Sequence, residues 1–324
     1  MNTQISTQSN LNIVGNKKSK IKLFLKQLDI QSMVWPGIIY LIIFSYIPMY
    51  GLIIAFKNYS IYSPGIQGFF TAPDVGFKYF EQFLTDPKFY EVLVNTLGIN
   101  ILGLVIGFPI PIIFALLLNE LNNEKFKRFV QTVSYLPHFI SWIIFGGLMM
   151  AILSTDSGII NNILVRQLGI LKEPIFFMGE PNYFWLLIVI LGLLKEMGWS
   201  AIMYLAAIAG VSNEMYEAAV IDGAGRFKRM WYITLPSITG VIVILLIFRI
   251  SGMLNSGFDS VYVLQNPLNI PRSEVLDTYI YKLGIQSSRF SYSTAVGLAK
   301  SIVALILLAL ANITSKKVTG HGLY

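Results

Sequence analysis

The sequence predicts an all-α integral membrane protein with six membrane-spanning helices. Of its 324 residues, 55% are hydrophobic and only 13% are charged, about half the charged fraction of an average globular domain. The hydrophobic residues gather in long blocks, each able to cross about 30 Å of hydrocarbon as a helix. A polar, charged island at 217–236 separates two of these blocks.

The composition excludes several classes of function. The chain has no cysteine and only 2 histidines, which leaves little for metal binding or nucleophilic catalysis. It contains no G-x-x-x-x-G-K-[ST] phosphate loop, no H-E-x-x-H and no G-x-S-x-G. The net charge of +7 is expected to lie in cytoplasmic loops, and no nucleic-acid-binding pattern is present. We predict that the chain is not an enzyme and has no cofactor of its own.

The chain begins with a polar tail at 1–32 that contains five lysines. We interpret it as a cytoplasmic tail, with an amphipathic helix at 21–30. A secretory signal is the alternative, but the first hydrophobic block at 33–56 is too long for a signal core and no cleavage site follows. The membrane domain is therefore expected at 33–324.

Five further spans are predicted at 92–118, 133–153, 183–209, 238–254 and 295–313. Pro109 and Pro111 must kink or unwind the second span. His138 begins the third span, where a lone histidine is usually a hydrogen-bonded structural group. A long polar segment at 255–292 joins the last two spans.

Charged residues inside the fourth and fifth spans need an explanation, because charge is costly in lipid. Lys195 and Glu196 are adjacent, so they cannot pair as i,i+4 neighbours do. Each is expected to find a partner on another span or to face water. Arg249 is the candidate partner of Glu196, and an ion pair that only fixes helix packing is the alternative.

The polar island has the local chemistry of a helix–turn–helix. Ser212 can cap a helix whose first turns contain Glu214 and Glu217. Gly223 can adopt the positive φ of a tight turn, with Gly225 close by. Pro236 suits the start of the next helix.

The spacing of this island resembles the signature loop of membrane subunits of ATP-binding-cassette importers: E-A-A, three residues, G, nine residues, I, one residue, L-P. The resemblance implies an importer permease fold with a cytoplasmic coupling helix between spans 4 and 5, which docks on a separate ATPase subunit. Glu217 is expected to pair with a basic group there, or else only to stabilise the helix dipole. The coupling residues implied are Glu217, Ala218, Ala219, Asp222, Gly223, Ile233, Leu235 and Pro236.

Other segments are similar to the oligosaccharide-importer branch of this family, of the maltose-transporter type, that takes up polysaccharide fragments. They are 198–207, 257–259, 266–268, 277–279 and 322–324, together with Gly76, Phe80, Asp86, Phe89, Asn95 and Thr96. The resemblance implies a second, non-identical permease subunit, two ATPase subunits that bind ATP and Mg²⁺, and an extracytoplasmic solute-binding protein.

The resemblance places the signature loop, and hence both termini, on the cytoplasmic side of a bacterial inner membrane. Lysine and arginine support this orientation, with 13 in the loops assigned to the inside and 8 in the longer outside loops.

The fourth and fifth spans supply polar and aromatic groups that suit a path for a sugar. The candidates for this path are Lys195, Glu196, Trp199, Tyr204, Arg249, Ser251, Asn255 and Asp259. We predict an oligosaccharide of at least two units. A uronate-containing fragment of alginate or pectin would suit Lys195 and Arg249, unless Glu196 or Asp259 already neutralises these cations. A permease for another solute, a secondary transporter and a membrane scaffold subunit are the alternatives.

Overall fold

The computed structural model describes residues 28–60, 62, 65–320 and 322–323. This part of the chain is helical, with no β-strand and one isolated bridge between Lys57 and Asp74. The chain divides into two compact units, Met1–Ile53 and Ile54–Tyr324, and each is described by itself. Most of the predicted tail, including 21–27 of its amphipathic helix, lies outside the described residues.

The first unit contains most of the first predicted span, whose last three residues, 54–56, belong to the second unit. Helix α2 (Leu28–Leu41) is followed by a π-helical turn at Ile42–Tyr46 and a 3₁₀ segment at Ile47–Phe56. Together they form an apolar stretch of 26 residues, Gln31–Phe56, whose side chains are mostly exposed. Such exposure is typical of a helix that faces lipid.

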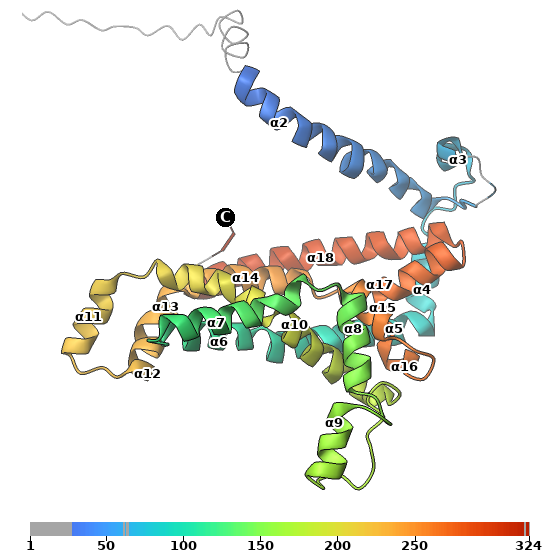
Figure 1. Ribbon diagram of the computed structural model, residues 1–324. Helices are drawn as coiled ribbons and strands as arrows, with labels where there is room; N and C mark the ends of the chain where they lie inside the picture. Colours follow the sequence, from blue (N-terminus) through green and yellow to red (C-terminus); the bar gives the residue numbers. More distant parts are fainter. Residues whose placement is uncertain (1–27, 61, 63–64, 321, 324) are drawn as a thin grey trace, which may run out of the picture. The chain divides into compact units, whose positions relative to one another are not determined.

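The second unit is a bundle centred on α10 (Phe184–Ala209), the long helix that carries the predicted mid-membrane charges (Figure 1). Helix α10 contacts α5, α6, α7 and α14, and α14 contacts α18. The bounds are α5 (Pro87–Leu102), α6 (Pro109–Asn119), α7 (Glu124–Tyr135), α14 (Thr239–Ser251) and α18 (Phe290–Thr319).

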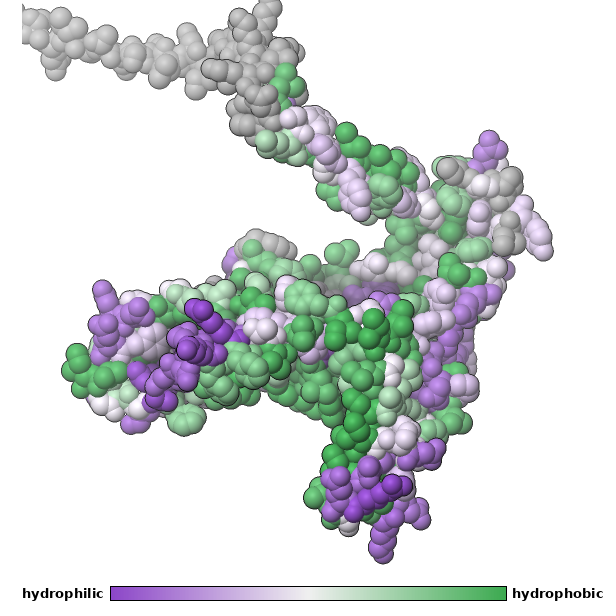
Figure 2. Space-filling model, in the orientation of Figure 1, coloured by the Kyte–Doolittle hydropathy of each residue, from purple (hydrophilic) through white to green (hydrophobic). Residues whose placement is uncertain are grey.

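Shorter helices occupy the two ends of this bundle (Figure 1). Helices α11 (Asn213–Ile221), α12 (Arg226–Arg229) and α13 (Leu235–Ser237) lie at one end, and α4 (Lys78–Thr85), α15 (Phe258–Leu264), α16 (Ile270–Ser273) and α17 (Leu276–Tyr281) lie at the other. The remaining helices are α3 (Gly65–Thr71), α8 (Trp142–Ile152) and α9 (Ile159–Asn161). Figure 2 shows hydrophobic residues along the bundle and hydrophilic residues on α11–α12 and near α9.

In the described residues, four helices are long and apolar enough to cross a membrane, or up to six if each of two bent pairs is one span. The predicted six spans agree with the larger number. The third span is not a straight helix, because Glu124–Phe139 and Trp142–Ile152 meet at 106°. The fifth span is preceded by a bend of 63° between Arg226–Ser237 and Thr239–Ser251.

The expected distortion of the second span is present. A π-helical turn at Gly103–Gly107 separates α5 from α6, directly before Pro109. Proline has no N–H to donate to the carbonyl four residues earlier, so the α-helical bonding pattern is interrupted there.

A close helix contact brings the bend of the third span against α10. Gly198 is buried, and a Cβ added to it would collide with the carbonyl oxygen of Ser134 on α7. The missing side chain lets the two backbones touch, as small residues do between membrane helices. The turn at Leu136–Phe139 is thereby held beside the middle of α10.

Candidate functional site

A cavity of about 680 Å³ opens on the bundle between α10 and the helices around it. Its wall is built from five parts of the chain: the α5–α6 region, Trp142 of α8, the middle of α10, the end of α14 and the segment that leads into α15. The volume is within the range of ligand-binding cavities, about 300–1,000 Å³.

The structure brings five of the eight predicted path residues to this cavity. Glu196, Trp199, Tyr204, Arg249 and Asn255 line it. Asn100, Ser256 and Ser260 also line it; of these, Asn100 and Ser260 were not predicted. The sequence offers little reason to select these two. Asn100 lies within the second predicted span and Ser260 directly after the segment 257–259, but neither belongs to a motif.

The other three predicted path residues lie elsewhere. Lys195 is buried, with 4% exposure, and does not line the cavity. The Ser251 hydroxyl donates to the carbonyl of Phe248 at 2.8 Å and ends α14. Asp259 is exposed in the first turn of α15. We therefore remove these three from the cavity wall.

The predicted pairing of Glu196 with Arg249 is wrong. Lys195 Nζ lies 3.1 Å from Glu196 Oε1, and His138 Nδ1 lies 2.6 Å from Glu196 Oε2. The expectation that the adjacent Lys195 and Glu196 do not pair with each other is also wrong, because both side chains are long enough to bend toward each other. His138 has the hydrogen-bonded role that we expected.

Lys195 also donates to the carbonyl oxygen of His138 at 2.7 Å. This bond satisfies a backbone acceptor at the bend of the third span, where the helical bonding pattern is broken. The three groups Lys195, Glu196 and His138 thus satisfy one another within the bundle, as buried charges in a membrane protein must.

Arg249 has no hydrogen-bond or ion-pair partner among the described residues. Its guanidinium lies against the bare backbone of Gly103, where a Cβ would collide with Nη2. The π-helical turn of the second span therefore makes room for the arginine in the cavity wall. An arginine that lines a cavity and lacks a carboxylate partner is ready to pair with an anionic group of a ligand.

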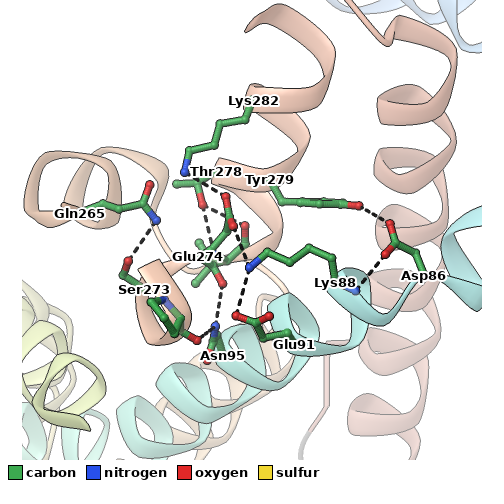
Figure 3. Close-up of polar contacts among 12 residues, drawn as sticks. Asp86, Lys88, Glu91, Asn95, Gln265, Ser273, Glu274, Thr278, Tyr279 and Lys282 are labelled. Atoms are coloured by element: carbon green, nitrogen blue, oxygen red, sulfur yellow. Dashed lines mark hydrogen bonds and ion pairs between the residues drawn. The ribbon is translucent and has the colours of Figure 1, made fainter. Parts of the chain in front are cut away.

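A second polar cluster lies at the α15–α17 end of the bundle (Figure 3). Glu274, only 6% exposed, receives Lys282 at 2.9 Å and Lys88 at 3.3 Å. Lys88 also pairs with Glu91 at 3.0 Å. Asn95 donates to the carbonyl oxygens of Pro271 and Glu274. These contacts tie the start of α5 to the segment between α16 and α17.

Tyrosines extend this cluster toward α18. The Tyr279 hydroxyl donates to Asp86 Oδ2 at 3.0 Å (Figure 3), and Tyr292 OH lies 3.3 Å from the same oxygen. Burial raises the pKa of Tyr279, so this hydroxyl remains a proton donor. Asp86, Asn95 and Tyr279 belong to the predicted family pattern. In the structure their hydrogen bonds join the start of α5 to the α16–α17 region.

A chain of contacts runs to the cavity from Asp277 of α17, the helix that also carries Tyr279. Asp277 pairs with Lys300 and accepts from the backbone N–H of Ser256 at 3.1 Å. The Ser256 hydroxyl accepts from Asn100 Nδ2 at 2.9 Å. Ser256 and Asn100 both line the cavity. Helix α17 is therefore tied to one part of the cavity wall.

The signature loop lies at the opposite end of the bundle (Figure 1). The Ser212 side chain accepts from the N–H of Glu214 at 3.3 Å and caps α11, as predicted. Gly223 has φ of 74° and forms the turn, whereas Gly225 has φ of −68° and begins α12. The Tyr216 hydroxyl and Thr234 Oγ1, 2.9 Å apart, tie α11 to the π-helical turn Met230–Thr234 in the returning part of the loop.

The predicted coupling residues divide into two groups. Glu217, Ala218, Asp222 and Gly223 are exposed, and Ala219 is half-buried. Ile233 and Leu235 are half-buried beside exposed Pro236, which lies in α13 directly after a π-helical turn at Met230–Thr234. Pro236 therefore stands at the end of the returning helix, before the 63° bend. The first group forms an open surface, whereas Leu235 of the second packs against the hydrophobic cluster between α6 and α10.

The family model described as binding-protein-dependent transport system inner membrane component matches residues 107–320. The chain belongs to this family. The match includes the cavity-lining parts of α10 and α14 and the whole signature loop. The resemblance drawn from the loop spacing is confirmed, and the chain is a multi-pass inner membrane component of such a transport system.

Curated relatives from Bacillus subtilis (strain 168) share most of the chain. Protein LplB is 46% identical over 289 residues, which cover 89% of this chain and 89% of that protein. The polygalacturonan/rhamnogalacturonan transport system permease protein YteP is 44% identical over 315 residues, which cover 96% of each.

Two solved structures have the same fold. A chain of a bacterial ABC transporter involved in the import of the acidic polysaccharide alginate is 36% identical, with a TM-score of 0.82 and coverage of 93% of this chain and 99% of that one. A chain of a bacterial alginate ABC transporter in complex with alginate pentasaccharide-bound periplasmic protein is 35% identical, with a TM-score of 0.83 and the same coverage.

The buried ion cluster should matter for stability. Replacing Glu274 by Gln leaves two lysines without their shared carboxylate, and breaking a buried pair costs about 3–5 kcal/mol. Glu91→Gln is the matched control, because a pair with exposed partners is worth about 0–1 kcal/mol. We expect the midpoint of thermal unfolding of the detergent-purified protein to fall clearly more for Glu274→Gln. Equal decreases in the unfolding midpoint for the two variants would show that the buried cluster stabilises the protein no more than the exposed pair does.

Proposed function

We propose that this chain is the permease subunit of an ATP-driven, binding-protein-dependent importer of oligosaccharides and forms half of the translocation pathway. The observation that carries the proposal is the cavity on α10, with an aromatic side chain and an unpartnered arginine in its wall. Membership in the family supports it, as does similarity to a polygalacturonan/rhamnogalacturonan transport system permease and to a transporter involved in the import of alginate.

The proposed complex contains several other proteins. A second permease subunit of non-identical sequence covers the open side of the cavity. Two ATPase subunits bind ATP and Mg²⁺, and this chain binds neither. An extracytoplasmic solute-binding protein delivers the oligosaccharide, by analogy with the similar transporter that was solved with its periplasmic protein.

Both termini and the α11–α12 loop are proposed to face the cytoplasm of a bacterial cell. The loop carries Arg226, Lys228 and Arg229, as expected of a cytoplasmic loop. A cysteine introduced at exposed Phe227, in this cysteine-free chain, should escape an impermeant thiol reagent added to intact cells. A cysteine at Ile170, also exposed, should react, and labelling at 227 would refute this orientation.

The signature loop is proposed to transmit ATP hydrolysis to the permease by docking Glu217 to Gly223 on the ATPase. Ala218 and Glu217 are exposed on α11, and Met215 is 47% exposed beside them. Ala219, Ile233 and Leu235 are half-buried within the loop.

Gly223→Asp should abolish uptake while the protein stays in the membrane. The φ of 74° at this glycine is in the left-handed region, and a side chain there costs on the order of 1–2 kcal/mol. A β-carbon would meet no neighbour at Gly223, so the expected defect lies in the shape of the docking turn. The measurement is substrate-stimulated ATPase activity of the purified complex. Gly225→Ala, at a negative φ, is the control, and wild-type stimulation of Gly223→Asp would contradict the coupling role.

The proposed substrate is an acidic oligosaccharide of at least two units, such as a fragment of pectin or alginate. Lys195 is neutralised by Glu196, so within this group of intramembrane charges only Arg249 lacks a partner in the described structure. A uronate carboxylate would supply that partner, and a charge-assisted hydrogen bond to it is worth about 1.5–3 kcal/mol.

Arg249→Gln should lower the apparent affinity of transport for trigalacturonate by roughly tenfold or more, because about 1.4 kcal/mol is tenfold. Arg249→Lys keeps the positive charge, so its apparent affinity should lie between those of the wild type and Arg249→Gln. The measurement is ATPase activity of the reconstituted complex, stimulated by the binding protein loaded with neutral or acidic oligosaccharides.

Oligosaccharide binding to the isolated binding protein is the control, since Arg249 is not part of it. Stimulation by neutral oligosaccharides alone would refute the acidic substrate and leave an oligosaccharide importer. Stimulation by an amino acid, a peptide or an inorganic anion, with none by any saccharide, would refute the substrate class. Uptake without ATP would favour a secondary transporter.

A further inference from the structure

Trp199 is the aromatic side chain of α10 best placed to contact a ligand in the cavity. It lines the cavity and is 45% exposed, so about half of the side chain is free. One side of its indole is occupied: the His138 ring lies parallel to it, with ring centroids 4.3 Å apart and planes inclined by 2°. Phe139 contacts it at 5.8 Å in an edge-on arrangement.

His138 is itself held from two directions. Its Nδ1 lies 2.6 Å from Glu196 Oε2, so the imidazole and the carboxyl group share a hydrogen bond. Its backbone carbonyl accepts from Lys195 Nζ. Both its ring plane and its backbone are therefore fixed to α10, the helix that carries Trp199.

We infer that His138 is a positioning residue for the substrate path: anchored by Glu196 and Lys195, it sets the plane of the Trp199 indole in the cavity wall. The inference rests on the proposed function of the cavity. Saccharide rings bind through their apolar faces to aromatic rings, and such contacts require a ring of defined orientation. An indole that is already fixed loses less conformational entropy when a sugar stacks on it.

His138 lies in the 3₁₀ turn Leu136–Phe139, directly before the break of the third span, beside Glu196 and Trp199. The sequence did not single out this triad, because His138 is 58 residues from Glu196.

The test uses four variants in the reconstituted complex, with trigalacturonate delivered by the binding protein. His138→Gln removes the ring but can still reach Glu196. His138→Phe keeps a ring but loses the bond to Glu196. Trp199→Ala removes the indole. Leu136→Ala is the control on the same turn, since Leu136 is 63% exposed and its apolar side chain cannot hydrogen-bond to Glu196.

We expect His138→Gln to raise the half-saturating substrate concentration roughly three- to tenfold, as the loss of an aromatic pair would, with a small change in maximal rate. His138→Phe should recover part of this loss, and Leu136→Ala should behave as wild type. In protein labelled with 5-fluorotryptophan, the ¹⁹F resonance assigned by Trp199→Phe should shift in His138→Gln.

Each contrary result has a defined meaning. If Trp199→Ala leaves half-saturation unchanged, the cavity wall is not the substrate path and the proposed function of the cavity fails. If Trp199→Ala impairs half-saturation but His138→Gln changes neither half-saturation nor the ¹⁹F resonance, the positioning inference is wrong. If His138→Gln lowers the amount of assembled complex but changes neither half-saturation nor the ¹⁹F resonance, His138 is a purely structural residue and the inference is also refuted.

Discussion

This structure depends on one constraint: inside a lipid-embedded bundle, a charged side chain has few possible partners. A charged side chain in the membrane must find an opposite charge, a backbone acceptor or water. Lys195, Glu196 and His138 satisfy one another and in doing so hold the bend of the third span against α10. Arg249 alone in this region has no such partner among the described residues, and it lines the cavity. The same rule thus explains both a structural cluster and the chemistry of the proposed path.

Backbone geometry makes these contacts possible. Gly198 allows α7 to touch α10, and Gly103 gives the Arg249 guanidinium its place. The π-helical turn before Pro109 and the break after Phe139 interrupt two spans beside the cavity. Irregular helices are tolerated at membrane depth where protein or a water-filled cavity covers the freed polar groups. The contacts of Asp277, Ser256 and Asn100 then connect the cavity wall to α17.

The sequence was sufficient to predict the helical membrane fold, the family and the geometry of the signature loop, because these follow from hydrophobic run length and local spacing. Ser212 and Gly223 perform the local tasks that their chemistry predicts. Contacts between distant residues were out of reach: Glu274 is brought to Lys88 only by the fold. The pairing of Glu196 was missed because backbone periodicity does not describe where long side chains bend. Lys195, Ser251 and Asp259 were placed in the path because they are close in sequence to residues that do line the cavity.

The central claim is that the cavity on α10 is a water-filled path for the substrate, and accessibility of single cysteines tests it most directly. Ser200 lines the cavity, whereas Leu194 is 56% exposed on the same helix but does not line it. The chain has no cysteine of its own, so each replacement reports on one position. We predict that a small charged thiol reagent modifies Ser200→Cys in the assembled complex, that trigalacturonate with its binding protein changes the rate, and that Leu194→Cys reacts far more slowly. Equal rates at the two positions, with no effect of the oligosaccharide, would contradict the account.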